Sequence, residues 1–408
     1  MADRSVDHLL IGGFAAGHCA KKLREEGAEG SILLVAREAD APYERPPLSK
    51  EYLRGDAARE DALVVPAGWW EENDVELLTR TSAMKLDLEA RSVKLSTKEE
   101  VGFDKLLIAT GANVRRLRVD GSDLEGIHYL RAFGNADAIR EDIAGCERIV
   151  LIGGSYIGAE VAASLTELGK RCTILMQEET VLERSFGPEV GRFFRGVLED
   201  HGVVVRGGDE LGSFEGEDGR VASVISGSGE RIECDCVVIG AGVMPDVMLA
   251  KAAGLEIGES GGVLASKSLE SSAPGVFVAG DMAEFDSVVH GRSLRKEHWD
   301  VARGHGETAA LAMLGRDSAH DDVPYFFSDL ADWVSLEYVG DGSGDGVIRG
   351  SLEDGEFSVF YLDDGGRLSA ALSVGRSDDL EHARRMIRAG ATPSREALAD
   401  PSADLAEL

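Results

Sequence analysis

One order of elements, a strand, a glycine turn, a helix and a second strand, occurs twice in this 408-residue chain and restricts its fold more than any other feature. Residues 148–178, RIVLIGGSYIGAEVAASLTELGKRCTILMQE, repeat the order already found in residues 6–38. In that first copy LLIGGFAAGH (residues 9–18) joins strand to helix, and GSILLVARE (residues 30–38) supplies the next strand. Two such βαβ units predict an α/β chain with two Rossmann-like, three-layer domains.

The first glycine turn raises the question whether it cradles a dinucleotide. The fingerprint G-x-G-x-x-G needs one glycine for the tight turn, one for backbone approach to a pyrophosphate and one for close helix packing. One register has Gly12 and Gly17 with Phe14 between them, and the alternative keeps only Gly13. On this stretch alone, an altered cradle and an ordinary strand–turn–helix corner remain equally open.

The second turn fits the fingerprint better. It reads Gly153, Ser155 and Gly158, and a serine is small enough for the backbone to approach a pyrophosphate. Two copies imply two nucleotide sites, although the spacing alone also permits two plain parallel-sheet units.

Composition limits the partners. The formal net charge is −31, and because phosphate binding needs a basic face, a nucleic-acid partner is not expected. A hydrophobic content of 43% with 29% charged residues is typical of a globular protein. The apolar run after Met1 stops at Gly12, too early for a signal peptide or a membrane span, so a cytoplasmic location is expected.

The five cysteines are scattered, which indicates free thiols. Cys234 and Cys236 form the only close pair, within the strand-like ECDCVVIG. Because alternate strand residues share one face, both thiols lie on one side, where a core or surface role is favoured over a metal or redox role. No metal site is expected.

Two further apolar strands run into turns of small residues, KLLIATGAN (residues 105–113) and GVFVAGDMAEF (residues 275–285). Asp281, directly after the second of these strands, is placed to accept a hydrogen bond from a cofactor hydroxyl; capping the following helix is the alternative.

These segments, taken together, resemble the flavoprotein pyridine-nucleotide reductases, in particular the ferredoxin or rubredoxin reductase branch that includes apoptosis-inducing-factor-like proteins. The resemblance spans nearly the whole chain in the family's order. It is carried by PYERPPLSKEYLRG (42–55), ATG (109–111), YLRAFGNADAIR (129–140), GGSYIGAEVAASL (153–165), APGVFVAGD (273–281), RKEHWDVARGHGETAALAMLG (295–315) and VPYFFSDL (323–330).

The resemblance implies a discontinuous FAD-binding domain, an NAD-binding domain and a C-terminal α+β domain. Their expected ranges are 1–113 with 247–322, 114–246, and 323–408. It also implies that Lys50 and Glu160 are catalytic, as an ion pair beside the flavin. The cofactor-binding residues it implies are Gly12, Gly13, Ala15, Ala16, Arg45, Lys50, Ala83, Ala109, Thr110, Gly111, Arg131, Gly153, Gly154, Ser155, Tyr156, Ile157, Gly158, Glu160, Gln177, Glu178, Gly240, Gly242, Asp281, Glu297, His298 and Trp299.

An absence of cysteine separates the branches of this family. Disulfide reductases need a cysteine pair on the helix after the first βαβ unit, and residues 39–60 contain no cysteine. We therefore expect a reductase that takes electrons from NADH through FAD to a ferredoxin or rubredoxin, serving an oxygenase or P450 system. The alternative is an apoptosis-inducing-factor-like flavoprotein with a conformational role and poor turnover. A monomer or a homodimer is expected.

The residues after the strand CTILM predict NADH rather than NADPH. Gln177 and Glu178 suit free ribose hydroxyls, whereas a 2′-phosphate needs a nearby Arg or Lys, and the next basic residue along the chain is Arg184. Basic residues gather elsewhere, at residues 115–118 and 292–296, and each cluster is either a docking site for an acidic partner or a solvated surface.

Overall fold

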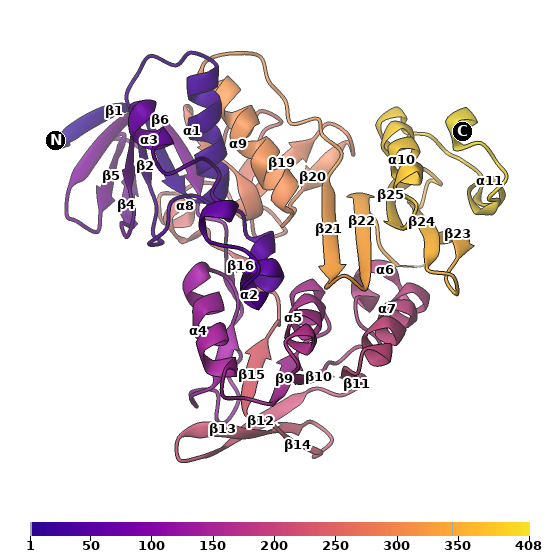
Figure 1. Cartoon of the computed structure of the whole chain (residues 1–408). Coiled ribbons are helices and arrows are strands. Elements are labelled where there is room, and N and C mark those ends of the chain that lie inside the picture. Colours follow the sequence, from indigo (N-terminus) through magenta and orange to yellow (C-terminus); the bar gives the residue numbers. More distant parts are fainter. Residues whose placement is uncertain (1, 345) are drawn as a thin grey trace. The chain divides into compact units, whose positions relative to one another are not determined.

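A computed structural model describes residues 2–344 and 346–408, which form two compact units (Figure 1). The first unit comprises residues 1–45, 59–113 and 244–324, and the second comprises residues 46–58, 114–243 and 325–408. The chain passes between them at residues 45–46, 58–59 and 324–325, and also within β7 (Ala112–Val114) and β16 (Val243–Pro245).

The first unit is built on a parallel sheet. β1 lies between β2 and β6, β3 extends the sheet beyond β2, and β18 pairs with the second half of β6. The first half of β6 pairs antiparallel with β5, which pairs with β4. The bounds are β1 (Arg4–Gly12), β2 (Ile32–Val35), β3 (Val75–Leu78), β4 (Ala83–Asp87), β5 (Ser92–Leu95), β6 (Glu100–Ala109) and β18 (Val276–Val278).

Two helices of this unit pack closely on each other. α1 (Phe14–Glu25) meets α9 (Trp299–Met313), where a Cβ on Gly306 would lie 2.3 Å from the carbonyl oxygen of Ala15. Ala15 and Ala16 are buried in α1, β2 is buried and apolar throughout, and β1 buries Val6 and residues 9–11 together with one polar residue, His8. The other elements are η2 (Glu60–Ala62), α3 (Trp69–Glu72), α8 (Met248–Ala252), η3 (Gly280–Met282) and the small sheet of β17 (Val263–Ala265), β19 (Ala283–Ser287) and β20 (Arg292–Leu294).

The second unit contains a parallel sheet in the order β11, β10, β9, β15, β8. Its strands are β8 (Ile127–Tyr129), β9 (Arg148–Ile152), β10 (Arg171–Leu175), β11 (Val204–Arg206) and β15 (Cys236–Ile239). Its helices are η1 (Pro46–Ser49), α2 (Glu51–Arg54), α4 (Phe133–Ile143), α5 (Tyr156–Glu167), α6 (Glu183–Phe186) and α7 (Pro188–Asp200). The two parallel sheets agree with the predicted α/β class.

Two antiparallel sheets complete this unit. The smaller one contains β12 (Leu211–Glu217), β13 (Arg220–Ser226) and β14 (Arg231–Glu233). The C-terminal sheet has the order β21, β22, β25, β24, β23, and α10 packs on it. Its elements are β21 (Tyr325–Leu330), β22 (Val334–Gly340), β23 (Val347–Ser351), β24 (Glu356–Leu362), β25 (Leu368–Val374), α10 (Ser377–Ala389), α11 (Arg395–Ala399) and η4 (Leu405–Glu407).

Within residues 2–344 and 346–408, no helix combines the length and the apolar character needed to cross a bilayer.

Candidate cofactor and catalytic sites

At the first glycine turn, Gly12 and Gly17 lie too close to neighbouring atoms to carry a side chain. Gly12 has φ +143°, and a Cβ there would lie 2.1 Å from the carbonyl oxygen of Ala109, so the position requires glycine. A Cβ on Gly17 would lie 2.6 Å from the Cβ of Pro42. These contacts select the register in which Phe14 takes the middle position.

Phe14 packs its ring against two other aromatic rings. Its ring stacks on Trp299 with centroids 6.1 Å apart and meets His18 edge-on at 4.7 Å. A Cβ on Gly13 would have no atom within 4 Å. Among the described residues, no side chain caps α1 and no acid lies in its first turn. The first N–H groups of α1 are therefore open to a phosphate, which the helix dipole favours.

Glu38 is absent from the predicted site, yet it lies just beyond β2 and contacts Tyr43 and the predicted residue Arg45. Its carboxylate accepts hydrogen bonds from the Tyr43 hydroxyl at 2.5 Å and from the Arg45 guanidinium at 2.6 Å. Burial alone would lower the pKa of Arg45, but Tyr43, Glu38 and Asp281 raise it above its ordinary value. An acid after the second strand of a βαβ unit is the signal that would have identified Glu38.

The predicted turn 109–111 follows the carboxyl end of β6, which pairs parallel with β1, whereas Ala83 lies at the amino end of β4, which pairs antiparallel with β5. The Gly111 carbonyl accepts the Asp246 N–H at 2.8 Å. Ala83 begins β4, and in the loop before it the Thr81 N–H donates at 3.0 Å to the backbone that follows β2.

Asp281 and the segment 297–299 are joined by one arginine. The Arg295 guanidinium donates to the Asp281 carbonyl at 3.1 Å and to the Glu297 carboxylate at 2.6 Å. His298 is the N-cap position of α9, which begins at Trp299. Asp281 itself lies inside η3, whose N-cap position belongs to a different residue, Ala279, so the helix-cap alternative for Asp281 is wrong.

At the second glycine turn, Gly153 and Gly158 also lie too close to neighbouring atoms to carry a side chain. Gly153 has φ +104°, and a Cβ there would lie 2.7 Å from the Gly240 carbonyl oxygen; a Cβ on Gly158 would lie 2.1 Å from the Gly153 carbonyl. The Ser155 hydroxyl donates to the Gly240 carbonyl at 3.0 Å. In the part of the chain that the structure describes, α5, which begins at Tyr156, has no side-chain cap and no acid in its first turn. Its N-terminus is therefore also open to a phosphate.

The remaining residues predicted around this turn differ in exposure. A Cβ on Gly154 would lie 2.2 Å from the Met176 sulfur, so that glycine is needed for packing. Ile157 is an exposed apolar residue at the start of α5. Gly242 has φ +84° and open space beside it.

The acid predicted at the end of β10 is already paired. The Arg184 guanidinium forms an ion pair with Glu178, and Gln177 donates to the Glu210 carboxylate at 3.1 Å. A basic group therefore lies where the sequence order suggested only carboxylates. The sequence alone did not show that the turn after β10 brings Arg184 to Glu178.

Lys50 and Glu160 form a buried ion pair, as predicted. Lys50 Nζ lies 3.1 Å from Glu160 Oε1, and both side chains are less than a tenth exposed. The Pro46 carbonyl accepts from the same ammonium at 3.3 Å. Two serines that are absent from the predicted site donate to Glu160: Ser49 to Oε2 at 2.5 Å and Ser328 to Oε1 at 2.6 Å. These two hydroxyls come from segments that no local motif links to Glu160.

Arg131 follows β8, at the same carboxyl edge of the parallel sheet as Gly153. Elsewhere in this unit, His128, Asp142 and Cys236 bring possible metal-ligand atoms within 4.8 Å of one another. Asp142 is already bonded at 2.6 Å to His128 and at 2.6 Å to Arg220, and this guanidinium opposes a cation. We assign no metal to this group.

All five cysteines are free and buried. Burial raises the pKa of Cys172 to about 11 and that of Cys234 to about 12, so these thiols are poor nucleophiles at neutral pH.

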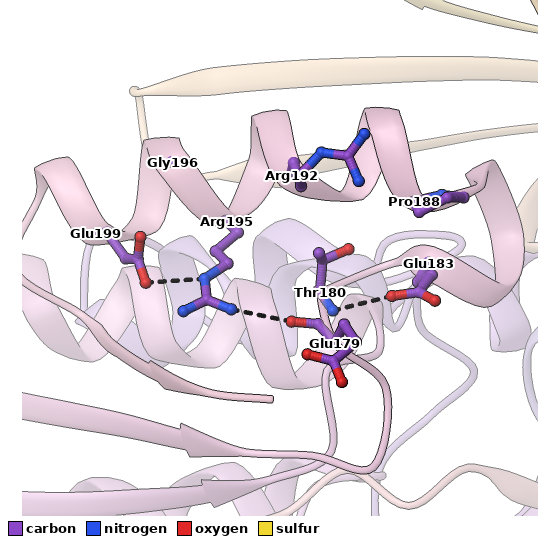
Figure 2. A pocket seen from close by; sticks show the side chains of 8 residues that line it. All are labelled: Glu179, Thr180, Glu183, Pro188, Arg192, Arg195, Gly196 and Glu199. Atoms are coloured by element: carbon purple, nitrogen blue, oxygen red, sulfur yellow. Dashed lines mark hydrogen bonds and ion pairs between the residues drawn. The ribbon is translucent and has the colours of Figure 1, made fainter. Parts of the chain in front are cut away.

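A surface pocket of about 480 Å³ lies between α7 and the segment that follows β10 (Figure 2). Arg195 crosses it, donating to the Glu199 carboxylate at 2.9 Å and to the Glu179 carbonyl at 3.0 Å. None of its lining residues belongs to the predicted sites. They are Glu179, Thr180, Glu183, Pro188, Arg192, Arg195, Gly196 and Glu199.

Comparison with known proteins confirms the resemblance and the fold class. The pyridine nucleotide-disulphide oxidoreductase family matches residues 6–306, and the reductase C-terminal family matches residues 325–408. The chain is 33% identical to the ferredoxin–NAD(+) reductase component of the anthranilate 1,2-dioxygenase system of Burkholderia cepacia, covering 98% of this chain and 99% of that protein.

Two solved structures are similar over their full length. The ferredoxin reductase for the CYP199A2 system from Rhodopseudomonas palustris has a TM-score of 0.92 at 31% identity, covering 98% of this chain and 99% of the other. Putidaredoxin reductase, in its covalent complex with putidaredoxin, has a TM-score of 0.92 at 31% identity, covering 100% of this chain and 98% of the other.

Proposed function

We propose an activity from the premise that this chain belongs to the pyridine nucleotide-disulphide oxidoreductase family and carries the reductase C-terminal domain. The chain is an FAD-dependent oxidoreductase that takes electrons from NADH and passes them to a ferredoxin or rubredoxin, which serves an oxygenase or P450 system. The observation that carries this proposal is the pair of uncapped helix N-termini, each behind a glycine turn, together with a buried Lys–Glu pair.

Both cofactors fit the residues present. The turn at Gly12 and the start of α1 suit the FAD pyrophosphate, and the turn at Gly153 and the start of α5 suit that of NADH, because in each case N–H groups and open space replace a capping side chain. Glu38 and Asp281 supply carboxylates for the hydroxyl groups of FAD. The bound flavin accepts a hydride from the nicotinamide and releases electrons singly.

With FAD bound, Lys50 would supply positive charge to the electron density that arrives on the flavin. An ammonium has three N–H donors, and among the described residues Glu160 and the Pro46 carbonyl accept from it, so the third donor would serve the cofactor. Glu160 keeps the ammonium in place. Lys50 also lies 5.2 Å from the centroid of the Phe327 ring, which shields it from water on that side.

The electron acceptor follows from the relatives and from the cysteines. The matched proteins named above are ferredoxin or putidaredoxin reductases. Residues 39–60 hold no cysteine for a disulfide step. We further propose a cytoplasmic monomer or homodimer.

The test is spectroscopic. The purified protein should carry FAD, NADH should bleach the flavin absorbance under anaerobic conditions, and a ferredoxin or ferricyanide should restore it. Glutathione disulfide should not. A protein that stays colourless after incubation with FAD would contradict the proposal.

A further inference from the structure

The Glu160 carboxylate accepts hydrogen bonds from two serine hydroxyls in addition to its ion pair with Lys50. Lys50 and Ser328 both contact Oε1, at 3.1 and 2.6 Å, while Ser49 alone contacts Oε2, at 2.5 Å. Ser49 and Ser328 are each 2% exposed and Glu160 is 4% exposed, so solvent does not compete for these bonds. A buried carboxylate that keeps its charge needs such donors, and hydrogen bonds to an ionised group are the stronger kind.

Ser328 lies on β21, and this strand contacts α5 at two positions. Residues two apart in a strand face the same side, as do residues four apart in a helix. The Phe326 ring meets the Tyr156 ring at 5.0 Å, and Ser328 meets Glu160. The C-terminal sheet therefore reaches α5 with an aromatic contact and a hydrogen bond one helical turn apart.

Ser49 is fixed independently of Ser328. Its carbonyl accepts from the Ser164 hydroxyl, one turn beyond Glu160 on α5, at 2.7 Å. Since Ser49 directly precedes Lys50, this bond holds the start of the lysine's backbone against the same helix that carries Glu160.

We propose that Ser49 and Ser328 are positioning residues, which by occupying both carboxylate oxygens of Glu160 set the direction in which it holds the Lys50 ammonium. The proposal deepens the proposed function and rests on it. The C-terminal sheet thereby contributes to the hydride-transfer site through Ser328.

The first test uses the protein without nicotinamide. Isotope-edited infrared spectra of protein labelled at glutamate, with Glu160→Gln to assign the band, report the carboxylate stretch of Glu160. In Ser328→Ala and Ser49→Ala we expect this band to shift, and in Ser328→Thr, which keeps the hydroxyl, to return toward the wild-type position. Ser358→Ala is the matched control, because Ser358 is a buried serine of the same sheet that donates to a different carboxylate, Asp379, at 2.8 Å.

The second test measures flavin reduction by NADH in the same variants. We expect the limiting rate to fall about tenfold in Ser328→Ala while the dissociation constant of NAD⁺ changes less than about twofold, which corresponds to a loss made in the transition state. Ser358→Ala should lower thermal stability by a similar amount without changing that rate.

Two results would overturn the proposal. One is an unshifted Glu160 band in both alanine variants, and the other is an equal loss of rate in Ser328→Ala and Ser358→Ala. A wild-type protein that NADH does not reduce would contradict the proposed function. The infrared test does not depend on reduction by NADH, so it tests the roles of Ser49 and Ser328 separately.

Discussion

Phe14 stacks on Trp299 with ring centroids 6.1 Å apart, so the unexpected side chain of the first glycine turn packs against the start of α9. Gly12, two residues earlier, has the opposite constraint, because a Cβ there would lie 2.1 Å from a carbonyl oxygen. Neighbouring positions of one loop are thus constrained by different physical causes.

Phe14→Gly should therefore leave FAD bound, with affinity within about threefold of the wild type. It should lower the free energy of unfolding by about 1–3 kcal/mol, because a ring contact is lost and a glycine enters the helix. Gly12→Ala is the comparison: it should lose FAD during purification. Flavin content and thermal unfolding measure both, and tighter FAD binding in Phe14→Gly would show that the ring obstructs the site.

The ion pair between Arg184 and Glu178 governs the expected nicotinamide preference. In the wild type, with the guanidinium held by Glu178, we expect kcat/KM for NADH to exceed that for NADPH by tenfold or more, about 1.4 kcal/mol. Glu178→Ala frees Arg184 for a 2′-phosphate, so the value for NADPH should rise. The double variant Glu178→Ala, Arg184→Ala should lose that gain. Equal use of both nucleotides by the wild type would contradict this account.

The Lys50–Glu160 pair should behave as one unit. Lys50→Met or Glu160→Gln alone leaves a buried partner without its counterpart, so their effects on the rate of flavin reduction should be non-additive by about 1–3 kcal/mol. The exposed pair Arg195 and Glu199 is the control and should show coupling below about 0.5 kcal/mol in stability. Additive losses for Lys50 and Glu160 would show that the two groups act separately.

The stability of the first unit should depend on pH through the protonation of His18. Burial lowers the pKa of His18 to about 4 from its ordinary value of 6.5. Below pH 6.5 the unfolded chain binds a proton that the folded chain refuses, so stability is complete above pH 6.5 and falls as the pH is lowered toward 4. The positive charges of Lys21 and Arg303 lower this pKa further, and the loss amounts to about 3 kcal/mol at most. In His18→Gln, unfolding measured from pH 7 to 4 should show a shallower decline; an unchanged slope would contradict this assignment.

The fold was predictable because its signals are local. The apolar strands and glycine turns of the two βαβ units are contiguous in the sequence, and both became parallel strands joined by a helix. The register of the first turn was not predictable, since the Ala109 carbonyl that selects it belongs to a strand far along the chain. The predicted domain boundaries remain predictions.

Some residues of the candidate site were also predictable from local motifs, and others were not. Lys50 and Glu160 stand in recognisable motifs, and their pairing was expected. Ser328 reaches Glu160 through a tertiary contact that no spacing encodes, whereas Arg184 lies within the same turn region as Glu178, and the fold of that turn decides their contact. Glu38 differs, because its position after the second strand is a known signal and could have been used.

The most direct test of the central claim is anaerobic rapid mixing of the purified, FAD-loaded protein with NADH, followed by a ferredoxin in a second mixing step. We predict that NADH bleaches the flavin absorbance and that the ferredoxin restores it as its own iron–sulfur absorbance falls, whereas glutathione disulfide leaves the flavin bleached. A flavin that NADH leaves oxidised, or that is reoxidised by glutathione disulfide and not by any ferredoxin or rubredoxin, would contradict the account.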